Sequence, residues 1–201
     1  DYFFDGPRVF QERIGRLEQI ISGCGVTPEV PIEEAMQYAT RQINQRLSSQ
    51  QRKIFQSYLA RIHSVHKAEL EVRKHPTKDE LLHIAATKGG YAALLGTVSL
   101  HSGRLSQEEE RAVYELGAFS QLIDDMRDAV RDSAAGIVTP ITELYLSDDE
   151  IIGAQRKMRT AVFDVGMPRE RTEYFLLIHQ LYFLSGLLAK HRYEASRKGS
   201  T

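Results

Sequence analysis

Apolar residues recur along most of this chain at the three- and four-residue spacing that is typical of amphipathic helices. In the first such segment Phe10, Ile14, Leu17 and Ile21 share one helical face. The one candidate strand, 26–32, is too rich in proline to be convincing. We therefore expect helices over 7–23, 31–47, about 49–75, 78–101, 107–133, 148–164 and 168–193, with a frayed tail over 196–201.

Several helix starts carry recognisable signatures. Three helices are preceded by a capping box, in which Ser or Thr is followed three residues later by Glu: Thr77 with Glu80, Ser106 with Glu109, and Ser147 with Glu150. Ser48 and Ser49 mark either a break between two helices or only a polar patch. The chain is thus expected to be an all-α bundle of about seven or eight helices, in a single domain over residues 1–201.

Composition and charge narrow the range of partners. The chain holds 26 Lys and Arg against 27 Asp and Glu, which gives a net charge of −1. Its basic residues are scattered and form no stripe of the kind that binds nucleic acid. Its longest apolar stretches, 174–178 and 181–189, are shorter than the ~20 residues of a membrane-spanning helix, so no transmembrane segment is expected. Cys24 is the only cysteine, which favours a reducing compartment and a cytoplasmic protein.

The most informative segment is an acidic helix. At about 100° per residue, its carboxylates fall on one stripe with a glycine and an amide, namely Asp124, Asp125, Asp128 and Asp132 with Gly117 and Gln121. The expected core residues face away from the stripe: Leu116, Phe119, Ile123, Met126 and Val130. Carboxylates one turn apart repel each other, and a cation such as Mg²⁺, which prefers oxygen ligands, would reverse that effect. The alternative is a solvated acidic face beside Arg127 and Arg131.

A second acidic pair stands at the start of the chain, where Asp1 and Asp5 are one helical turn apart. Phe3 and Phe4, between them, would face a core or an apolar substrate. The alternative is a chain end with two exposed acids.

Three basic or aromatic residues are candidates for binding an anion. Lys88 precedes Gly89 and Gly90 inside an otherwise good helix, where two glycines cost about 2 kcal/mol relative to alanine. A bend, a ligand that approaches the backbone, or close helix packing would each explain the glycines. Arg192 and Tyr193 lie near the end of an apolar helix and could donate to phosphate oxygens, or Arg192 could complement the helix dipole.

Together these segments resemble the class I isoprenoid (terpenoid) synthases, including terpene cyclases and squalene-type prenyltransferases. The sequence from Asp1 to Asp5 is similar to their first motif, Asp-Asp-x-x-Asp, with Tyr2 in place of the second aspartate. The sequence from Asp124 to Asp132 is similar to the second motif, and the neighbouring 116–121 and Gly136 strengthen the likeness. Lys88 is similar to a diphosphate-binding lysine, and Arg192-Tyr193 resembles a pair near the end of bacterial cyclases.

The resemblance implies an isoprenoid synthase class I fold around a central cavity. It implies catalysis by Asp1, Asp5, Asp124 and Asp128, and binding of Mg²⁺, three ions in all, by these residues with Asp125 and Asp132. The implied diphosphate ligands are Lys88, Arg192, Tyr193 and Arg8. The implied substrate cavity is formed by Phe3, Phe4, Tyr91, Phe119, Gln121 and Tyr182. A homodimer is a further expectation from this resemblance.

The function expected from the resemblance is ionisation of an allylic prenyl diphosphate, with release of diphosphate and cyclisation of the carbocation. The absence of helices before Asp1 suggests a chain that lacks the family's leading helices. The missing Arg-Arg after the first motif, and Ile137 in place of lysine after Gly136, count against chain elongation. The alternatives are coupling of two prenyl diphosphates, binding of a prenyl chain without turnover, and a non-catalytic helical interaction module.

Overall fold

The computed structural model describes residues 15–16, 19–20, 25–71, 76–100, 104–143, 146–166 and 169–198. All regular structure in these ranges is α-helical, which confirms the predicted all-α class. The helices are α2 (Pro31–Arg46), α3 (Ser49–Glu71), α4 (Lys78–Leu100), α5 (Gln107–Ala134), α6 (Asp148–Asp164) and α7 (Arg169–Lys198). The segment expected at 7–23 falls mostly outside the described residues, so the count of seven or eight helices stays a prediction.

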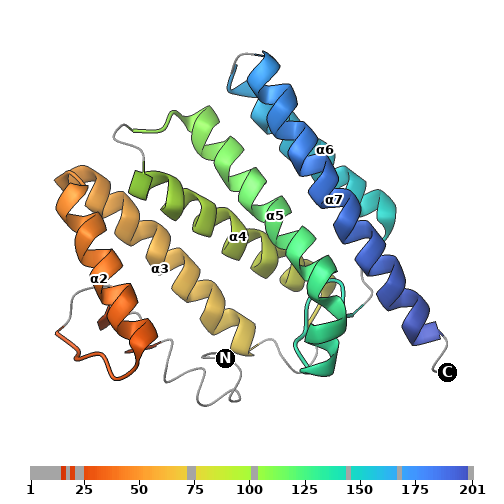
Figure 1. The fold of residues 1–201 in the computed structure, drawn as a ribbon, viewed down its shortest axis with the longest axis horizontal. Helices are drawn as coiled ribbons and strands as arrows, with labels where there is room; N and C mark the ends of the chain where they lie inside the picture. Colours follow the sequence, from red (N-terminus) through yellow and green to blue (C-terminus); the bar gives the residue numbers. More distant parts are fainter. Residues whose placement is uncertain are drawn as a thin grey trace.

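Helices α2, α3, α4 and α5 follow one another across the molecule in sequence order, and α6 and α7 lie together beyond α5, with α7 in front of α6 (Figure 1). Helix α4 packs between α3 and α5, and α5 in turn contacts both α6 and α7. Helix α5 is therefore the central element, with one side against α4 and another against the last two helices. Within the described residues, no helix is long and apolar enough to cross a membrane.

The three predicted capping boxes are present. In each, the glutamate backbone N–H donates to the Ser or Thr hydroxyl three residues earlier, and the glutamate carboxylate accepts from the Ser or Thr backbone N–H: Thr77 with Glu80, Ser106 with Glu109, Ser147 with Glu150. Hydrogen bonds from Lys78 and from Ser147 lower the pKa of Glu150 to about 2. The helix starts were thus readable from sequence because each depends only on local residues.

The interruption at Ser48 is a true break between helices rather than a polar patch. Ser48 N–H donates to Gln51 Oε1 at 3.0 Å, and Gln51 N–H donates to Ser48 Oγ at 3.3 Å. This is a fourth reciprocal cap, with glutamine in place of glutamate. Leu47, just before it, is buried with Phe55 and Tyr58 of α3, so the break also places an apolar residue in the core.

Removing one of these caps should cost a modest amount of stability. We expect Ser106→Ala to lower the free energy of unfolding by about 1 kcal/mol, because the N–H of Glu109 loses its acceptor. Ser133→Ala, at an exposed serine near the other end of α5, should change it by no more than about 0.5 kcal/mol. Urea unfolding of both variants measures the difference, and equal stabilities would contradict a stabilising role for the cap.

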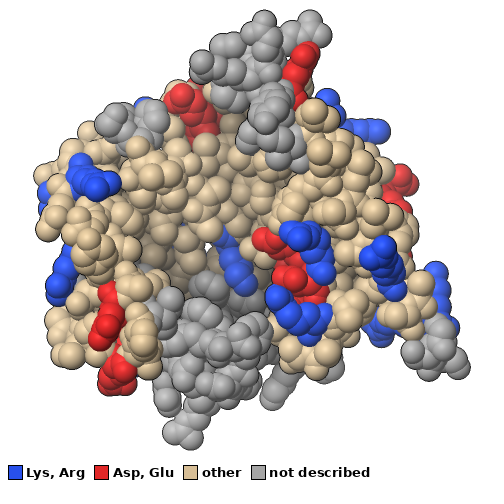
Figure 2. Space-filling model, viewed as in Figure 1, with Lys and Arg blue, Asp and Glu red and all other residues tan. Residues whose placement is uncertain are grey.

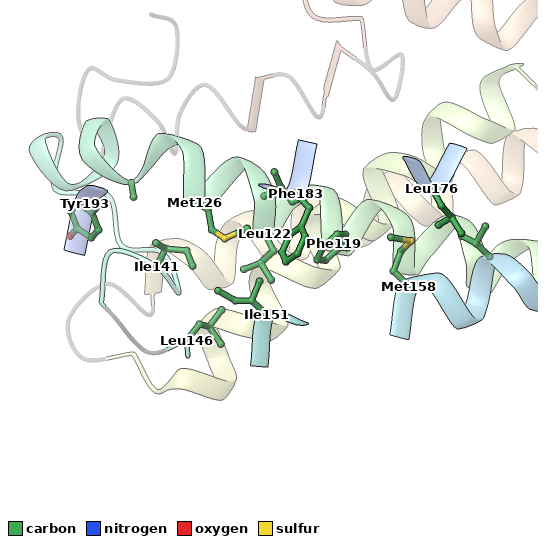
Figure 3. Packing of buried hydrophobic residues seen from close by; sticks show 13 residues of the cluster. Phe119, Leu122, Met126, Ile141, Leu146, Ile151, Met158, Leu176, Phe183 and Tyr193 are labelled. Carbon is green, nitrogen blue, oxygen red and sulfur yellow. The ribbon is translucent and has the colours of Figure 1, made fainter. Parts of the chain in front are cut away.

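The buried apolar residues of the described ranges include two clusters. The larger cluster joins α5, α6 and α7 with the segment between α5 and α6, and Figure 3 shows its side chains meeting there: Phe119, Leu122, Met126, Ile141, Leu146, Ile151, Met158, Leu176, Phe183 and Tyr193. The smaller cluster joins α3 and α4 with Leu47. Most of the core face predicted for α5 is confirmed, because Phe119, Ile123 and Met126 are buried.

Two details of the expected pattern are wrong. Val130 was expected in the core but is 60% exposed, because the buried face at this end of α5 passes through Ala129 instead. The tail was expected to fray from Ser196, but α7 continues to Lys198. Tertiary contacts hold the extra turn: the Arg197 guanidinium donates to the Thr142 carbonyl at 3.0 Å, and the Tyr193 hydroxyl donates to the same carbonyl at 3.1 Å.

The glycines of α4 mark a close approach of two helix backbones. A Cβ on Gly89 would lie 2.3 Å from the Gly117 carbonyl oxygen of α5, and a Cβ on Gly117 would lie 2.3 Å from the Gly89 oxygen. Gly90 faces the ring of Tyr114, where a Cβ would meet carbon atoms at 2.4 Å. Helix α4 runs without interruption through both glycines, so close packing explains them and a helix break does not.

Candidate active site

A cleft of about 210 Å³ lies between α4, the second half of α5 and the segment that follows α5. It is lined by Leu81, Ile84, Ala85, Lys88, Gln121, Asp124, Asp125, Asp128, Arg131, Asp132, Ile137, Val138, Thr139 and Pro140. Figure 2 shows acidic and basic side chains gathered over the second half of α5, beside a hollow in the surface. The cleft therefore combines a charged side with an apolar side.

Helix α5 brings the whole predicted acidic stripe to this cleft. All four aspartates line it, and Gln121 lies one turn before Asp125 on the same side. Asp125 and Asp132 are buried, whereas Asp124 and Asp128 are more open. Among the described residues that line it, four aspartates stand against one lysine and one arginine, Lys88 and Arg131, so this part of the cleft carries an excess of negative charge.

Each aspartate of the stripe has a neighbour that orients it. The Gln121 amide donates to Asp125 Oδ1 at 2.9 Å, and the Tyr182 hydroxyl of α7 donates to Asp124 Oδ1. Arg131 donates to Asp128 Oδ2 at 2.6 Å. The same guanidinium lies 3.6 Å from Asp132 Oδ1. Arg131 thus forms part of the cleft, which the sequence offered only as a neighbour of a solvated face.

Burial and the excess negative charge of the cleft both affect the pKa of Asp132. Burial raises the pKa of this carboxyl, and the nearby charge of Asp128 raises it further. Arg131 and Lys88 lower it, but they do not cancel the effect of burial. Additional positive charge in the cleft would therefore favour the ionised form of Asp132.

Lys88 belongs to the opposite side of the cleft, on α4. Leu81, Ile84 and Ala85 lie seven, four and three residues before it and so share its helical face. The Gly89–Gly117 contact next to Lys88 sets the separation of α4 and α5 at this point. The sequence pointed to Lys88 but missed the three apolar residues, although their helical spacing was a usable signal.

The third side of the cleft is a folded turn. At the end of α5, Gly136 takes a positive φ of 68°, and Ile137 N–H donates to the Asp132 carbonyl at 2.8 Å, as in a Schellman motif. The chain therefore reverses, and residues 137–140 return beside Asp132. Thr139 and Thr142 fix the turn, because Thr139 N–H donates to Thr142 Oγ1 at 2.8 Å and Thr142 N–H donates to Thr139 Oγ1 at 3.1 Å.

Several predicted site residues lie elsewhere among the described residues. Phe119 is buried in the larger core cluster, with its ring centroid 5.5 Å from that of Phe183. Tyr91 packs between Tyr58 and Tyr114, at 5.7 and 5.5 Å. None of these rings lines the cleft.

The expected Arg192–Tyr193 pair is also separate from the cleft. Tyr193 is buried and its hydroxyl binds the Thr142 carbonyl, while Arg192 is exposed. Tyr182, predicted for the cavity, contacts the acidic stripe through Asp124, and the Arg127 guanidinium lies 4.8 Å from its ring centroid. In the structure Tyr182 therefore orients Asp124, whereas Tyr193 holds the turn that ends at Thr142.

The sequence also predicted a first acidic motif at the start of the chain, with neighbouring aromatic and basic residues. Asp1, Phe3, Phe4, Asp5 and Arg8 all lie outside the described residues. Their assignments as metal, substrate or diphosphate ligands therefore stay predictions.

The donor set of the cleft fits Mg²⁺. Its available ligands are carboxylate oxygens, and their excess negative charge is what a hard cation would relieve. Within the part of the chain that the structure describes, no three acidic, His or Cys side chains converge on one point. Magnesium commonly uses one or two carboxylates together with substrate phosphates and waters, so one or two neighbouring members of the set Asp124, Asp128 and Asp132 would hold each ion jointly with a phosphate ligand.

Comparisons with models of protein families, with curated proteins and with solved structures give no match to this chain. Function is therefore inferred from the cleft, which combines an acidic stripe on α5, Lys88 on α4 and an apolar side.

Proposed function

We propose that the cleft binds the head group of an allylic prenyl diphosphate with Mg²⁺ and promotes cleavage of the allylic C–O bond, releasing diphosphate. The observation that carries this proposal is the position of Asp124, Asp128 and Asp132 along one cleft that Lys88 also lines. Carboxylates alone would repel a diphosphate, whereas carboxylates that hold a divalent cation would attract it. Lys88 adds a direct donor for a phosphate oxygen.

The residues of the chain would hold the leaving group in place. Lys88 and Arg131 donate to phosphate oxygens, and Tyr182 and Gln121 keep two carboxylates of the stripe oriented. When bound, Mg²⁺ neutralises the charge that develops on the departing diphosphate. The electron pair of the broken C–O bond leaves with the diphosphate oxygen, and the hydrocarbon retains the positive charge.

The apolar side of the cleft marks where the hydrocarbon would begin. Leu81, Ile84 and Pro140 stand beside the charged stripe, and the volume of about 210 Å³ is smaller than the ~300–1,000 Å³ typical of complete ligand pockets. The described cleft therefore corresponds to a head-group site. Cyclisation, with loss of a proton, is the proposed fate of the carbocation, and attack by the double bond of a second prenyl diphosphate is the alternative.

The test is diphosphate release from geranyl, farnesyl and geranylgeranyl diphosphate, with and without Mg²⁺, using protein that carries any native upstream residues. We expect release that requires Mg²⁺, and we expect Asp128→Asn to lower kcat/KM by about tenfold or more, because one anionic ligand is lost without a change of side-chain size. Asp149→Asn removes an exposed acid of α6 that lies outside the cleft and should leave release unchanged.

Circular dichroism and thermal unfolding would show that both variants are folded. No release from any of the three substrates by the folded, unaltered protein would contradict the proposal and favour a binding protein or an interaction module. Release of equal rate without Mg²⁺, or in Asp128→Asn, would contradict the role given to the acidic stripe. Hydrocarbon analysis of the products would then separate a cyclase from a coupling enzyme.

A further inference from the structure

An exposed row of leucines runs along α7, and we call it the leucine stripe. Its members keep a large exposed fraction: Leu177 (57%), Leu181 (62%), Leu184 (45%) and Leu188 (61%). Their spacing of four, three and four residues places them on one face of the helix. The buried face of α7, with Leu176 and Phe183, points the other way. A surface helix normally presents polar residues on its outer face, so four leucines there indicate a contact surface.

The leucine stripe lies on an outer element of the fold. Helix α7 stands at the edge of the helix row, with α6 behind it (Figure 1). A groove between α6 and α7 extends the apolar surface, because Phe163 is 48% exposed and lines this groove together with Leu177. The contact surface therefore includes the stripe and the adjoining α6 edge.

We propose that the leucine stripe joins two copies of this chain through antiparallel packing of their α7 helices. The spacing four, three, four is the same when read from either end of the helix. When two such helices lie antiparallel, Leu177 meets Leu188 of the partner subunit and Leu181 meets Leu184 of the partner subunit. The alternating spacing of three and four residues is also that of the apolar seam in paired helices.

Charge selects the antiparallel direction. Glu173 lies four residues before Leu177, and Arg192 lies four residues after Leu188, so the two charges are equally far from the centre of the stripe. Antiparallel packing brings Glu173 of one copy level with Arg192 of the partner subunit at both ends. Parallel packing would instead place glutamate level with glutamate and arginine level with arginine, which is unfavourable. The resulting contact is two-fold symmetric, as most homodimer contacts are.

This dimer does not depend on the proposed chemistry. The leucines of the stripe do not line the cleft, which lies between α4, α5 and residues 137–140. A dimer could therefore form whether or not the cleft releases diphosphate, and the two proposals can fail separately.

Sedimentation velocity of the full chain over about 1–100 µM tests the proposal. We expect a concentration-dependent dimer, and we expect Leu181→Glu/Leu184→Glu to raise its dissociation constant by about tenfold or more, because two charges per copy would be buried at the centre. Leu100→Glu is the matched control, since Leu100 is a 91% exposed leucine at the end of α4. It should leave the dissociation constant unchanged.

Charge reversal tests the direction of packing and does not rely on the leucine variant being folded. Glu173→Arg or Arg192→Glu alone should weaken the dimer, because each places like charges level with one another across the contact. The double variant Glu173→Arg/Arg192→Glu should restore it. Single reversals without effect on the dimer, or a double variant weaker than either single one, would overturn the antiparallel arrangement.

Two further outcomes would overturn the stripe as a homodimer surface. One is a dimer whose dissociation constant is the same in the unaltered chain and in Leu181→Glu/Leu184→Glu. The other is an unaltered chain that stays monomeric over the whole concentration range. In that second case, slow reaction of the Leu181→Cys thiol with a water-soluble reagent would assign the stripe to a segment of the same chain.

Discussion

Gly117→Ala is expected to destabilise this protein strongly, although it adds only one methyl group. The added Cβ would lie 2.3 Å from the Gly89 carbonyl oxygen and 2.5 Å from the Ala93 Cβ. Neither neighbour can rotate away, so α4 and α5 would have to separate. Overpacking of this kind costs about 3 kcal/mol and outweighs the gain of up to ~1 kcal/mol from alanine in a helix. With a net loss of about 2–3 kcal/mol, the melting temperature should fall by about 4–12 °C, measured by circular dichroism.

A glycine of the partner helix supplies the matched control. Gly96 of α4 has no atom within 4 Å of its ideal Cβ position, so Gly96→Ala should stabilise the protein by about 0.5–1 kcal/mol through helix propensity alone. Gly89→Ala should behave like Gly117→Ala, and the double variant should cost less than the sum because both changes act on the same contact between α4 and α5. If Gly117→Ala and Gly96→Ala are equally stable, the close α4–α5 contact is contradicted.

Removal of the Lys190 charge should also cause a large loss of stability. Lys190 is 3% exposed, and its ammonium lies 2.7 Å from Glu194 Oε1 and 2.9 Å from Asp148 Oδ1. Burial alone would lower the pKa of Lys190, but the hydrogen bonds to these carboxylates raise it above its usual value. Lys190→Met keeps the stem but removes the buried charge that both carboxylates share, leaving Asp148 with the neighbouring His191 alone at 3.1 Å. We expect a loss of about 2–3 kcal/mol, less than for a fully buried pair because both carboxylates are partly exposed.

An exposed ion pair, between Lys157 and Glu115, provides a comparison for the buried Lys190. Lys157 lies 2.8 Å from Glu115 but is 65% exposed, so Lys157→Met should cost less than about 1 kcal/mol.

The ion pair between Lys190 and Asp148 should also affect how the free energy of unfolding falls at acidic pH. The hydrogen bond from Lys190 lowers the pKa of Asp148, so the pair stabilises the fold at neutral pH and loses that effect as pH falls below about 4. Urea unfolding at several pH values should show a shallower acid limb for Lys190→Met; an unchanged limb would contradict it.

The fold was readable from sequence where local chemistry decides it. Helix starts at 78, 107 and 148 followed from side chains three residues apart, and the structure agrees. The end of α7 was misplaced because its last turn is held by a bond between Arg197 and the Thr142 carbonyl, more than fifty positions earlier in the chain. No pattern within α7 encodes that bond. The exposure of Val130 has the same origin, because it depends on which elements cover α5.

The residues of the candidate site were likewise predicted where they belong to one helix and missed where a chain reversal brings them together. The acidic stripe was predicted because its residues belong to one helix, and Lys88 was chosen for its chemistry. The turn at 137–140 was missed, since only the reversal after Gly136 brings it beside Asp132. Phe119 and Tyr91 were assigned to a cavity although they pack in the two core clusters. Aromatic residues suit a core and a substrate wall equally well, and sequence spacing does not distinguish the two.

The bonds at the Thr142 carbonyl have a consequence for when the cleft can form during synthesis. Residues 137–140 are positioned by the turn that ends at Thr142, and that carbonyl receives both Tyr193 and Arg197. Helices α4 and α5 leave the ribosome well before these two donors are made. A nascent chain therefore exposes its acidic stripe before the third side of the cleft is secured. The cleft is completed only after translation has passed the last turn of α7.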